Sequence, residues 1–584
     1  MKKSTAKMLM IIFIVSTLVT TLAACGSGNN GGNENNTNTN TNANTNTNSG
    51  NGGEGSGEDT NAEPITLSWF SVDPISSWNN MQDEVGKELT KKTGVTLEAE
   101  FAMDANRIAL MIASGDYPDM ISPKGDASKL VDAGALIDLR DLIEEHGPNL
   151  KKAYEKYWDR LRWSAEDDAI YILPTAESID QQYMDIAGSF HLQHAAVKEA
   201  GYPDIKTVKD YEAVIQQYVD QHPTTADGQP TIGLTVLADD WRIMIGVTNP
   251  AFYTTGAPDD GEFHINQETY EVTYHYRRPE EKEYFRWLNH MNDIGLLDRE
   301  AFVQKEDQYK AKIASGRVVG VIDQDWGFQD SVNALKAEGK FEQTYAHFPV
   351  TLTEEYKDHS LQSTGFMAGW GIGITTEAED PVRAIQFLDY LASEEGQILN
   401  NWGIEGKHYM VDENGTRVIP DEVLDRKVND ATNFTKESGI GMYSISARYG
   451  DGVKDSSGNY YTTKYPEQII QSYSDVEKET LSQYGVERWI ELWPQRDEFP
   501  VKPWGAAWNI STPTDTDYAV LYKTMEEITR RRIPEIILAE PAEFDALWDE
   551  YMTEIEENGV EKMEDEYETF VKARIEHWGG SVGL

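Results

Sequence analysis

The chain has 584 residues, with 51 Lys and Arg against 100 Asp and Glu, which gives a formal net charge of −49. This charge repels nucleic acid and anionic lipid headgroups, so it argues against both as partners. Neutral and cationic ligands stay open, and solubility alone also explains the charge. Because Cys25 is the only cysteine, disulfide bonds do not hold the fold, and the length is enough for at least two domains with hydrophobic cores.

Residues 1–24 have the pattern of a secreted protein's signal peptide. Three lysines precede the apolar run 8–15, and small residues stand directly before Cys25. The segment Leu22-Ala23-Ala24-Cys25 resembles a bacterial lipobox, which implies cleavage before Cys25 and a diacylglycerol on its sulfur. A plain secretory signal is the alternative. A membrane span is disfavoured, because polar residues shorten the apolar core below the roughly 20 residues that a spanning helix needs.

Residues 25–63 are predicted to be a lipidated cysteine followed by a disordered tether. Asn, Gly, Thr and Ser dominate this segment, and it lacks large apolar residues that could build a core. A flexible coil of this length has a root-mean-square reach of roughly 35 Å. We therefore expect a globular part, residues 64–584, held just outside the membrane.

From Pro64 the pattern alternates between strand and helix. The expected elements are a strand at 65–70, a helix at 76–92, a strand at 95–101, a helix capped by Asp104 and ended by Gly115, and a strand at 117–121. This order is typical of a parallel α/β layer, in which ligands bind beyond the carboxyl ends of the strands.

Several motifs occur in a fixed order along the chain. They are SGDYPD at 114–119, GALIDL at 134–139, AIYILP at 169–174, the Tyr-Pro, Thr and Asp-Tyr of 202–211, SGRVVGV at 315–321 with the Trp at 326, AIQFLDYL at 384–391, NWGIEGKHY at 401–409, and the helix residues of 536–551. In this order they resemble the motifs of family 1 extracellular solute-binding proteins, the capture subunits of ABC importers. The resemblance spans about residues 64 to 575.

The resemblance implies a two-lobed α/β fold of the periplasmic-binding-protein type II for residues 64–584. Each lobe is expected to hold a mostly parallel sheet flanked by helices, and hinge crossings make the lobes discontinuous in sequence. Local signals agree, since Asp380 can cap a helix with Pro381 at its first position, and Pro541 can open the last long helix.

The function implied by the resemblance is capture of a carbohydrate, most simply an oligosaccharide, without chemistry. The expected partners are the transmembrane subunits of an ABC permease with a separate ATPase, and the membrane itself through the lipid anchor. We expect a monomer on the extracellular face of the cell membrane, with no cofactor and no nucleic acid.

Aromatic residues at strand ends are the candidates for ligand contact. Sugar rings present apolar faces with a rim of hydroxyls, which suits an aromatic floor flanked by polar groups. Trp370 lies between Gly369 and Gly371, where a ligand could approach the backbone. Core packing is the alternative for each candidate. The predicted ligand-binding residues are Trp78, Asp119, Trp241, Trp326, Trp370, Trp402, Glu405, His408, Tyr409 and, as weaker candidates, Trp504 and Trp508.

Signals for catalysis and metal binding are scarce. Walker A and HExxH motifs are absent from the sequence, and we predict no catalytic residue. His191 and His194 are expected to share a helix face as a packed or surface pair, because no third metal ligand stands out. Residues 225–233, where many long relatives carry a calcium loop, offer one side-chain carboxylate, Asp227, which is too few for calcium. That stretch and Asp412–Gly415 are predicted to be turns.

Two alternative functions stay open at this point. A surface glycoside hydrolase or lyase is compatible with the many carboxylates, although no pair stands out by spacing. A carbohydrate-sensing partner of a signalling system would show the same binding residues.

Overall fold

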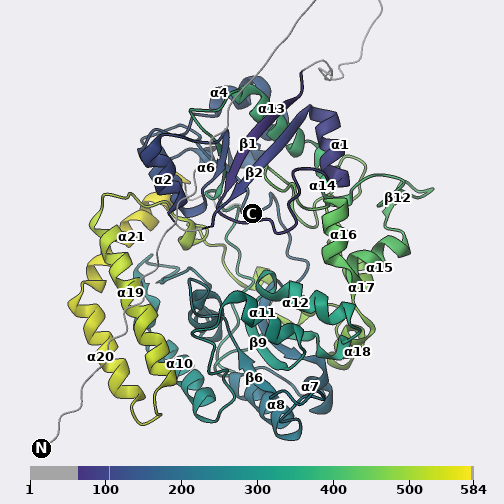
Figure 1. Cartoon of the computed structure of the whole chain (residues 1–584). Coiled ribbons are helices and arrows are strands. Elements are labelled where there is room, and N and C mark those ends of the chain that lie inside the picture. The colour runs from purple at the N-terminus through teal and green to yellow at the C-terminus, as the bar shows by residue number, and fades with distance from the viewer. Residues whose placement is uncertain (1–62, 104–105, 580–584) are drawn as a thin grey trace, which may run out of the picture. The chain divides into compact units, whose positions relative to one another are not determined.

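The computed structural model describes residues 63–103 and 106–579 (Figure 1). The predicted signal peptide, Cys25 and all but the last residue of the predicted tether lie outside these residues. Within the described part of the chain, none of the helices is both long enough and apolar enough to cross a membrane.

The first strands of the ordered chain form a five-stranded sheet. Its strands, in spatial order, are β2 (Val95–Phe101), β1 (Ile65–Ser71), β3 (Met120–Ser122), β11 (Gly371–Ile374) and β4 (Leu173–Pro174). β1 pairs in parallel with both β2 and β3, and β11 runs antiparallel to β3 and β4. Every strand except β11 therefore points the same way.

In a second sheet, of four strands, every strand except one again points the same way. Its strands, in spatial order, are β10 (Tyr345–Phe348), β5 (Gly188–Gln193), β9 (Val318–Gln324) and β6 (Ile232–Thr235). β6 and β9 are parallel, and β5 runs antiparallel to both β9 and β10. The chain passes from the first sheet to the second between β4 and β5 and returns between β10 and β11. The two halves are thus discontinuous in sequence, as expected.

Helices cover both faces of the first sheet, because its strands bury side chains on both sides. Leu67 and Trp69 of β1 belong to one hydrophobic cluster, and Phe70 belongs to another. The first cluster takes side chains from α1 (Glu84–Thr93), α4 (Arg140–His146), α5 (Pro148–Tyr154), α6 (Trp158–Leu161), α13 (Pro381–Ala392) and α14 (Glu394–Trp402). The second takes them from α2 (Arg107–Ser114) and α3 (Ala127–Asp132).

The second sheet also contributes to two hydrophobic clusters. The larger takes side chains from α7 (His194–Glu199), α8 (Val208–Gln221), α9 (Pro250–Thr254), α10 (Pro279–Asp293), α17 (Pro466–Ser472), α18 (Asp475–Tyr484), α19 (Asp517–Leu538), α20 (Phe544–Glu557), α21 (Val560–His577) and the hairpin of β7 (Phe263–Ile265) and β8 (Val272–Tyr274). The smaller takes them from α11 (Glu306–Ala314) and α12 (Asp325–Ala337). Both lobes are therefore layered α/β units, which confirms the predicted fold class.

Helix caps explain where the sequence-based boundaries hold and where they fail. Gly115 ends α2 with φ 70°, and Asp380 caps α13 by accepting from the Arg383 N–H, both as predicted. The expected helix at 76–92 begins only at Glu84, because the Asp83 side chain caps it there. α2 follows Asn106, and Asp104 lies outside the described residues.

Two predicted turns occur in the structure, and the predicted pair of histidines on one helix does not. Residues 225–229 form the predicted turn, whereas Ile232 and Gly233 already belong to β6. Asp412–Gly415 lies in the hairpin of β12 (Met410–Val411) and β13 (Arg417–Val418), as predicted. The short helices α15 (Asp421–Asn429) and α16 (Ala431–Ser438) follow this hairpin. The prediction that His191 and His194 share a helix face is wrong, because His191 lies on β5 and only His194 is helical. α20 begins at Phe544 rather than at Pro541.

Candidate functional site

Three tryptophans and one lysine lie just beyond the edges of the two sheets at which the parallel strands end. In the first sheet, Lys124 follows β3, and Trp370 stands directly before β11 at the same edge, because β11 is antiparallel to β3. In the second sheet, Trp326 is the second residue after β9. Trp241 lies six residues beyond β6, which is parallel to β9. Ligands of open α/β sheets bind at such edges.

These residues form a continuous row, which we call the tryptophan strip: Trp326, Trp241, Lys124, Trp370 and Trp508. The rings of Trp241 and Trp326 stack, with centroids 6.0 Å apart and 20° between the planes. The Lys124 ammonium lies 5.6 Å from the Trp241 ring centroid and 5.1 Å from that of Trp370. The Trp370 and Trp508 centroids are 4.6 Å apart. The strip thus joins residues of both sheets.

Exposure sets the tryptophan strip apart from the other aromatic residues. Trp326, Trp508 and Trp241 are 56%, 39% and 38% exposed, and they are the three most exposed of the chain's 15 tryptophans. Exposed indole surface in water is unfavourable, so a row of three such side chains indicates a binding surface. Its flat apolar faces suit the C–H face of a sugar ring.

Lys124 is held in place by a strained backbone and an ion pair. Its φ of 53° lies in the left-handed region, which costs a non-glycine residue about 1–2 kcal/mol. The Lys124 Nζ lies 2.9 Å from the Asp73 carboxylate, just beyond β1. Strained residues persist where the surroundings fix them, and they concentrate at functional sites. The ammonium is therefore presented to the two indole rings by the local fold.

Acidic and basic side chains surround a hollow beside Trp241. They line a hollow of about 580 Å³ formed by Asp239, Asp240, Arg242, Lys305, Glu306, Asp307 and Lys310. Arg242 pairs with Asp240 at 3.2 Å and with Glu306 at 2.6 Å, and its guanidinium lies 5.5 Å from the Trp241 ring centroid. The hollow thus offers charged hydrogen-bond donors and acceptors next to the exposed indole of Trp241.

Trp508 lies in the 3₁₀ turn η8 (Ala507–Asn509), which is anchored from inside the protein. Asp260 is 1% exposed, and its Oδ1 accepts from the Ala507 N–H at 3.2 Å and from Trp504 Nε1 at 3.1 Å. The Lys502 Nζ donates to the same oxygen at 2.7 Å. This buried ion pair holds the turn that carries Trp508.

The glycines on either side of Trp370 serve protein contacts. A Cβ on Gly371 would lie 1.8 Å from the Leu173 carbonyl oxygen, and one on Gly369 would lie 2.2 Å from the Asn509 side chain. The sequence-based interpretation, that these glycines admit a ligand, is wrong. Because these glycines lack side chains, β4 can pack against Gly371 and η8 against Gly369. The packing of η8 brings Trp508 against Trp370.

Of the predicted ligand residues, the structure gathers Trp241, Trp326 and Trp370 in the strip, together with the weaker candidate Trp508. The others serve the protein's interior or another surface. Trp402, His408 and Tyr409 are 3%, 5% and 7% exposed, and Trp504 is fully buried against Asp260. Glu405 is exposed in the turn that pairs with Tyr409.

Asp119 and Trp78 have protein partners as well. The Asp119 carboxylate accepts from the Ser68 N–H at 2.7 Å, the Ser68 hydroxyl at 2.6 Å and the Glu379 N–H at 2.8 Å. Trp78 packs edge-on against Trp69, with centroids 5.7 Å apart. Because the side chains of both residues contact other parts of the protein, we leave both residues out of the strip.

Sequence reasoning did not find Lys124. The available signal was its position, since Pro123-Lys124-Gly125 directly follows the third strand of a parallel layer. Its contact with Trp241, 117 positions away in sequence, had no sequence signal at all.

Glu177 lies in the segment that crosses from β4 to β5, and its side chain is half-buried. Its Oε2 accepts weak hydrogen bonds from the Met367 N–H at 3.3 Å and the Thr364 hydroxyl at 3.4 Å. Burial raises the pKa of Glu177 to about 7, although these two donors and the Arg496 and Arg448 guanidinium groups oppose the shift.

This raised pKa predicts a pH-dependent stability. The unfolded chain ionises Glu177 near pH 4.5, whereas the folded chain keeps it protonated up to about pH 7. The free energy of unfolding should therefore fall as the pH rises from about 4.5 to 7, by up to about 3 kcal/mol from this group. Urea unfolding at pH 5 and pH 8 should show a smaller fall for Glu177→Gln, whose amide oxygen still accepts both bonds. An equal fall in both proteins would contradict the prediction.

The comparison with known families covers more than half of the chain. The sequence pattern of the family described as bacterial extracellular solute-binding protein matches residues 84–401. The fructooligosaccharide ABC transporter substrate-binding protein FusA of Streptococcus pneumoniae is 23% identical over 351 residues, 57% of this chain and 62% of that protein. Lipoprotein LipO of Bacillus subtilis is 20% identical over 337 residues, 55% of this chain and 63% of that protein. The chain thus matches less than two thirds of each relative's length.

Solved structures share the fold over nearly their whole length. FusA of S. pneumoniae in complex with kestose matches with a TM-score of 0.62 and 17% identity, covering 88% of this chain and 99% of that one. A solute-binding protein of Bifidobacterium longum infantis described as HMO-binding matches with a TM-score of 0.61 and 14% identity, covering 88% of this chain and 99% of that one. The alginate-binding protein AlgQ2 matches with a TM-score of 0.58 and 17% identity, covering 88% of this chain and 100% of that one. By its sequence pattern and its fold, the chain belongs to the bacterial extracellular solute-binding proteins.

Proposed function

We propose that the chain is the substrate-binding component of an ABC importer and that it captures an oligosaccharide. The tryptophan strip carries this proposal, because its continuous row of contacts reaches both sheets and exposes the indoles of Trp326, Trp241 and Trp508. Stacked indoles and flanking charged groups suit the alternating apolar faces and hydroxyls of a carbohydrate. The names of the relatives FusA and AlgQ2 support a carbohydrate as the ligand class.

Capture works by a change in the angle between the lobes. Trp370 and Lys124 belong to the first sheet's edge, and Trp326 and Trp241 belong to the second, so a ligand on the strip contacts both lobes. The crossings β4–β5 and β10–β11 are the segments that absorb the hinge motion. The ligand favours the closed form only through contacts that it makes better in that form.

The same proposal places the protein on the outer face of the cell membrane. Cys25 carries the lipid, residues 26–63 are the tether, and the loaded monomer docks on permease subunits served by a separate ATPase. The chain performs no chemistry on the sugar. The family's extracellular location and the lipoprotein relative support this placement.

A ligand screen tests the proposal directly. The full-length chain in detergent is titrated with kestose, alginate oligosaccharides and human-milk oligosaccharides, and the melting temperature is measured. A ligand at 100 times its Kd should add about 2.7 kcal/mol to the free energy of unfolding. Release of new reducing ends from any of these sugars would instead favour a glycoside hydrolase, and the absence of binding by every carbohydrate tried would contradict the proposal.

Trp326→Ala tests the strip itself. Losing an indole face that the ligand buries should cost about 1.5–3 kcal/mol, so the Kd should rise about 10- to 100-fold in calorimetric titration. The melting temperature without ligand should change little, since Trp326 is mostly exposed. The matched control is Trp158→Ala, which removes a half-buried indole of α6 outside the strip and should leave the Kd unchanged. Equal affinities for Trp326→Ala and the unchanged chain would show that the ligand lies elsewhere.

A further inference from the structure

Two histidines of the second sheet face each other across neighbouring strands. His347 on β10 and His191 on β5 are directly paired in the antiparallel ladder, and their ring centroids are 4.8 Å apart. Asp325 is the first residue of α12 and directly follows β9, the strand next to β5. Its N–H donates to the Ala187 carbonyl at 2.7 Å. Two adjacent strands and the residue after a third therefore bring two imidazoles and a carboxylate together.

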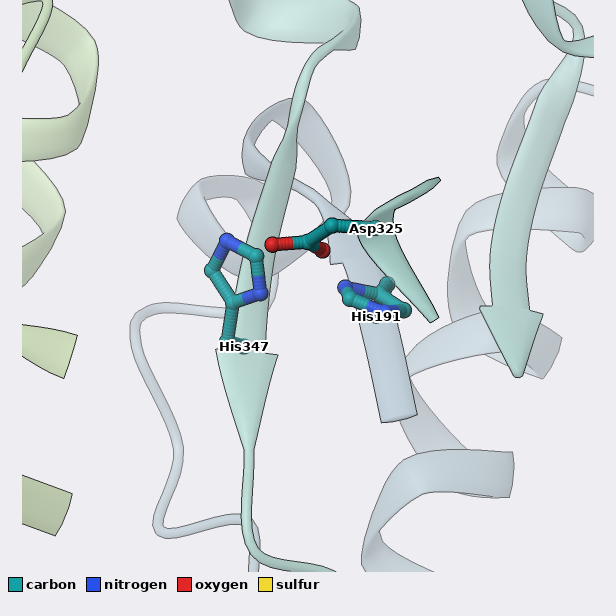
Figure 2. A group of neighbouring side chains, drawn as sticks. All are labelled: His191, Asp325 and His347. Carbon is teal, nitrogen blue, oxygen red and sulfur yellow. The ribbon is translucent and has the colours of Figure 1, made fainter. Parts of the chain in front are cut away.

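The possible ligand atoms of these side chains all lie within 4.8 Å of one another. Figure 2 shows the Asp325 carboxylate over the gap between the two imidazole rings. His191 is fully buried, and Nδ1 of both His191 and His347 is buried without a hydrogen-bond partner. A buried polar atom left in this state costs about 1–3 kcal/mol, so both nitrogens point to a missing partner.

The hydrogen bond on the far side of His191 fixes which nitrogen carries the proton. Its Nε2 lies 3.0 Å from the Asp323 carbonyl oxygen, which can only accept, so Nε2 carries the hydrogen. Nδ1 is then left with a free lone pair. Histidines that bind metals are held in this way, with the second ring nitrogen donating to a backbone carbonyl or a carboxylate.

We propose that His191, Asp325 and His347 bind one Zn²⁺ ion. Two imidazoles and one carboxylate are a typical donor set for zinc, whereas calcium and magnesium prefer oxygen ligands alone. Ligand atoms about 2.0 Å from a tetrahedral ion lie about 3.3 Å apart, so small side-chain rotations must draw the three together. Water or the second carboxylate oxygen completes the coordination.

The ion would tie the tryptophan strip to the second sheet. Asp325 is the residue directly before Trp326, the most exposed indole of the strip. A metal bond to Asp325 fixes the first turn of α12 against β5 and β10, which limits where the Trp326 ring can move. The ion is thus a positioning element, beyond the proposed capture of sugar.

Metal binding is measured on the full-length chain in detergent, stripped with a chelator and dialysed. We expect one zinc ion per chain by elemental analysis after addition of ZnSO₄, and a higher melting temperature that the chelator reverses. Titration with Co²⁺ should produce visible absorption bands of a low-coordinate nitrogen and oxygen site. Each of Asp325→Asn and His347→Asn should weaken binding at least about tenfold, since ligand loss exceeds the effect of outer partners.

Asp330→Asn is the matched control, because it removes an exposed carboxylate from the same helix, with 64% of its side chain accessible. It should bind zinc as the unchanged chain does. Circular dichroism of each variant without metal checks the fold. Failure of the unchanged chain to bind Zn²⁺ or Co²⁺, or equal binding by Asp325→Asn and the control, would overturn the proposal. No carbohydrate enters this experiment, so its outcome is separate from that of the proposed function.

Discussion

Replacing Lys502 with methionine is expected to lower the free energy of unfolding by about 3–5 kcal/mol. The side chains of Lys502 and Asp260 are 2% and 1% exposed, and their Nζ and Oδ1 atoms lie 2.7 Å apart. Methionine fills much the same volume but leaves the Asp260 carboxylate buried without its cation. Burial already raises the pKa of Asp260, and the Lys502 charge opposes that shift. Urea unfolding at pH 7 measures the loss.

Two further variants separate the buried charge from lost packing. The double variant Lys502→Met with Asp260→Asn should recover much of the stability, because the carboxylate that loses its ion-pair partner is then removed as well. Lys206→Met removes an exposed ion pair with Asp204 and should cost at most about 1 kcal/mol. A loss under 1 kcal/mol for Lys502→Met itself would show that the pair is not buried in solution.

Trp402→Ala is expected to lower the free energy of unfolding by about 3–5 kcal/mol, as for other buried aromatic residues. Trp402 is 3% exposed, and its Nε1 donates to the Tyr460 carbonyl at 3.0 Å. Its ring stacks on that of Tyr465, and the Arg417 guanidinium lies 5.4 Å from its centroid. The affinity of the remaining folded protein for sugar should stay within about twofold, because the indole is not part of the strip.

Trp402→Phe is the companion variant. It keeps an aromatic ring and loses the bond to Tyr460, so it should cost about 1 kcal/mol plus the smaller ring's lost packing. A strong loss of sugar affinity with full stability in Trp402→Ala would return residues 401–409 to the ligand site, where the sequence-based hypothesis had put them.

Local signals were enough to predict much of the fold. Strand β2 has its predicted bounds, Gly115 and Asp380 act as predicted at helix ends, and Thr207 opens α8 with a capping box. Trp326 could be picked as a candidate because it stands at the end of an apolar run, and Trp370 because glycines flank it. Such signals lie within a few residues of the position that they describe.

The rest of the site depends on contacts between distant parts of the chain. The partners that take up the indole N–H groups of Trp402 and Trp504 are 58 and 244 positions away in sequence. Likewise, Asp119 meets Ser68 and Glu379 across 51 and 260 positions. Composition and periodicity carry no record of these pairings, so buried and exposed tryptophans looked alike in the sequence.

His191 shows the same limit in another form. Its spacing to His194 suggested one helix face, but a strand ends between the two residues. The side chain that it meets is His347, 156 positions further along, through the register of β5 and β10.

The last helix links both halves of the protein. Val560, Met563, Tyr567 and Val571 of α21 belong to the hydrophobic cluster of the second sheet, whereas Trp578, just after it, belongs to that of the first. The Arg160 and Arg574 guanidinium groups lie 4.6 Å and 4.8 Å from the centroid of the Trp578 ring. The rotation between the halves proposed above would have to bend α21 or pull Trp578 out of the first sheet's cluster, so the last helix would resist that rotation.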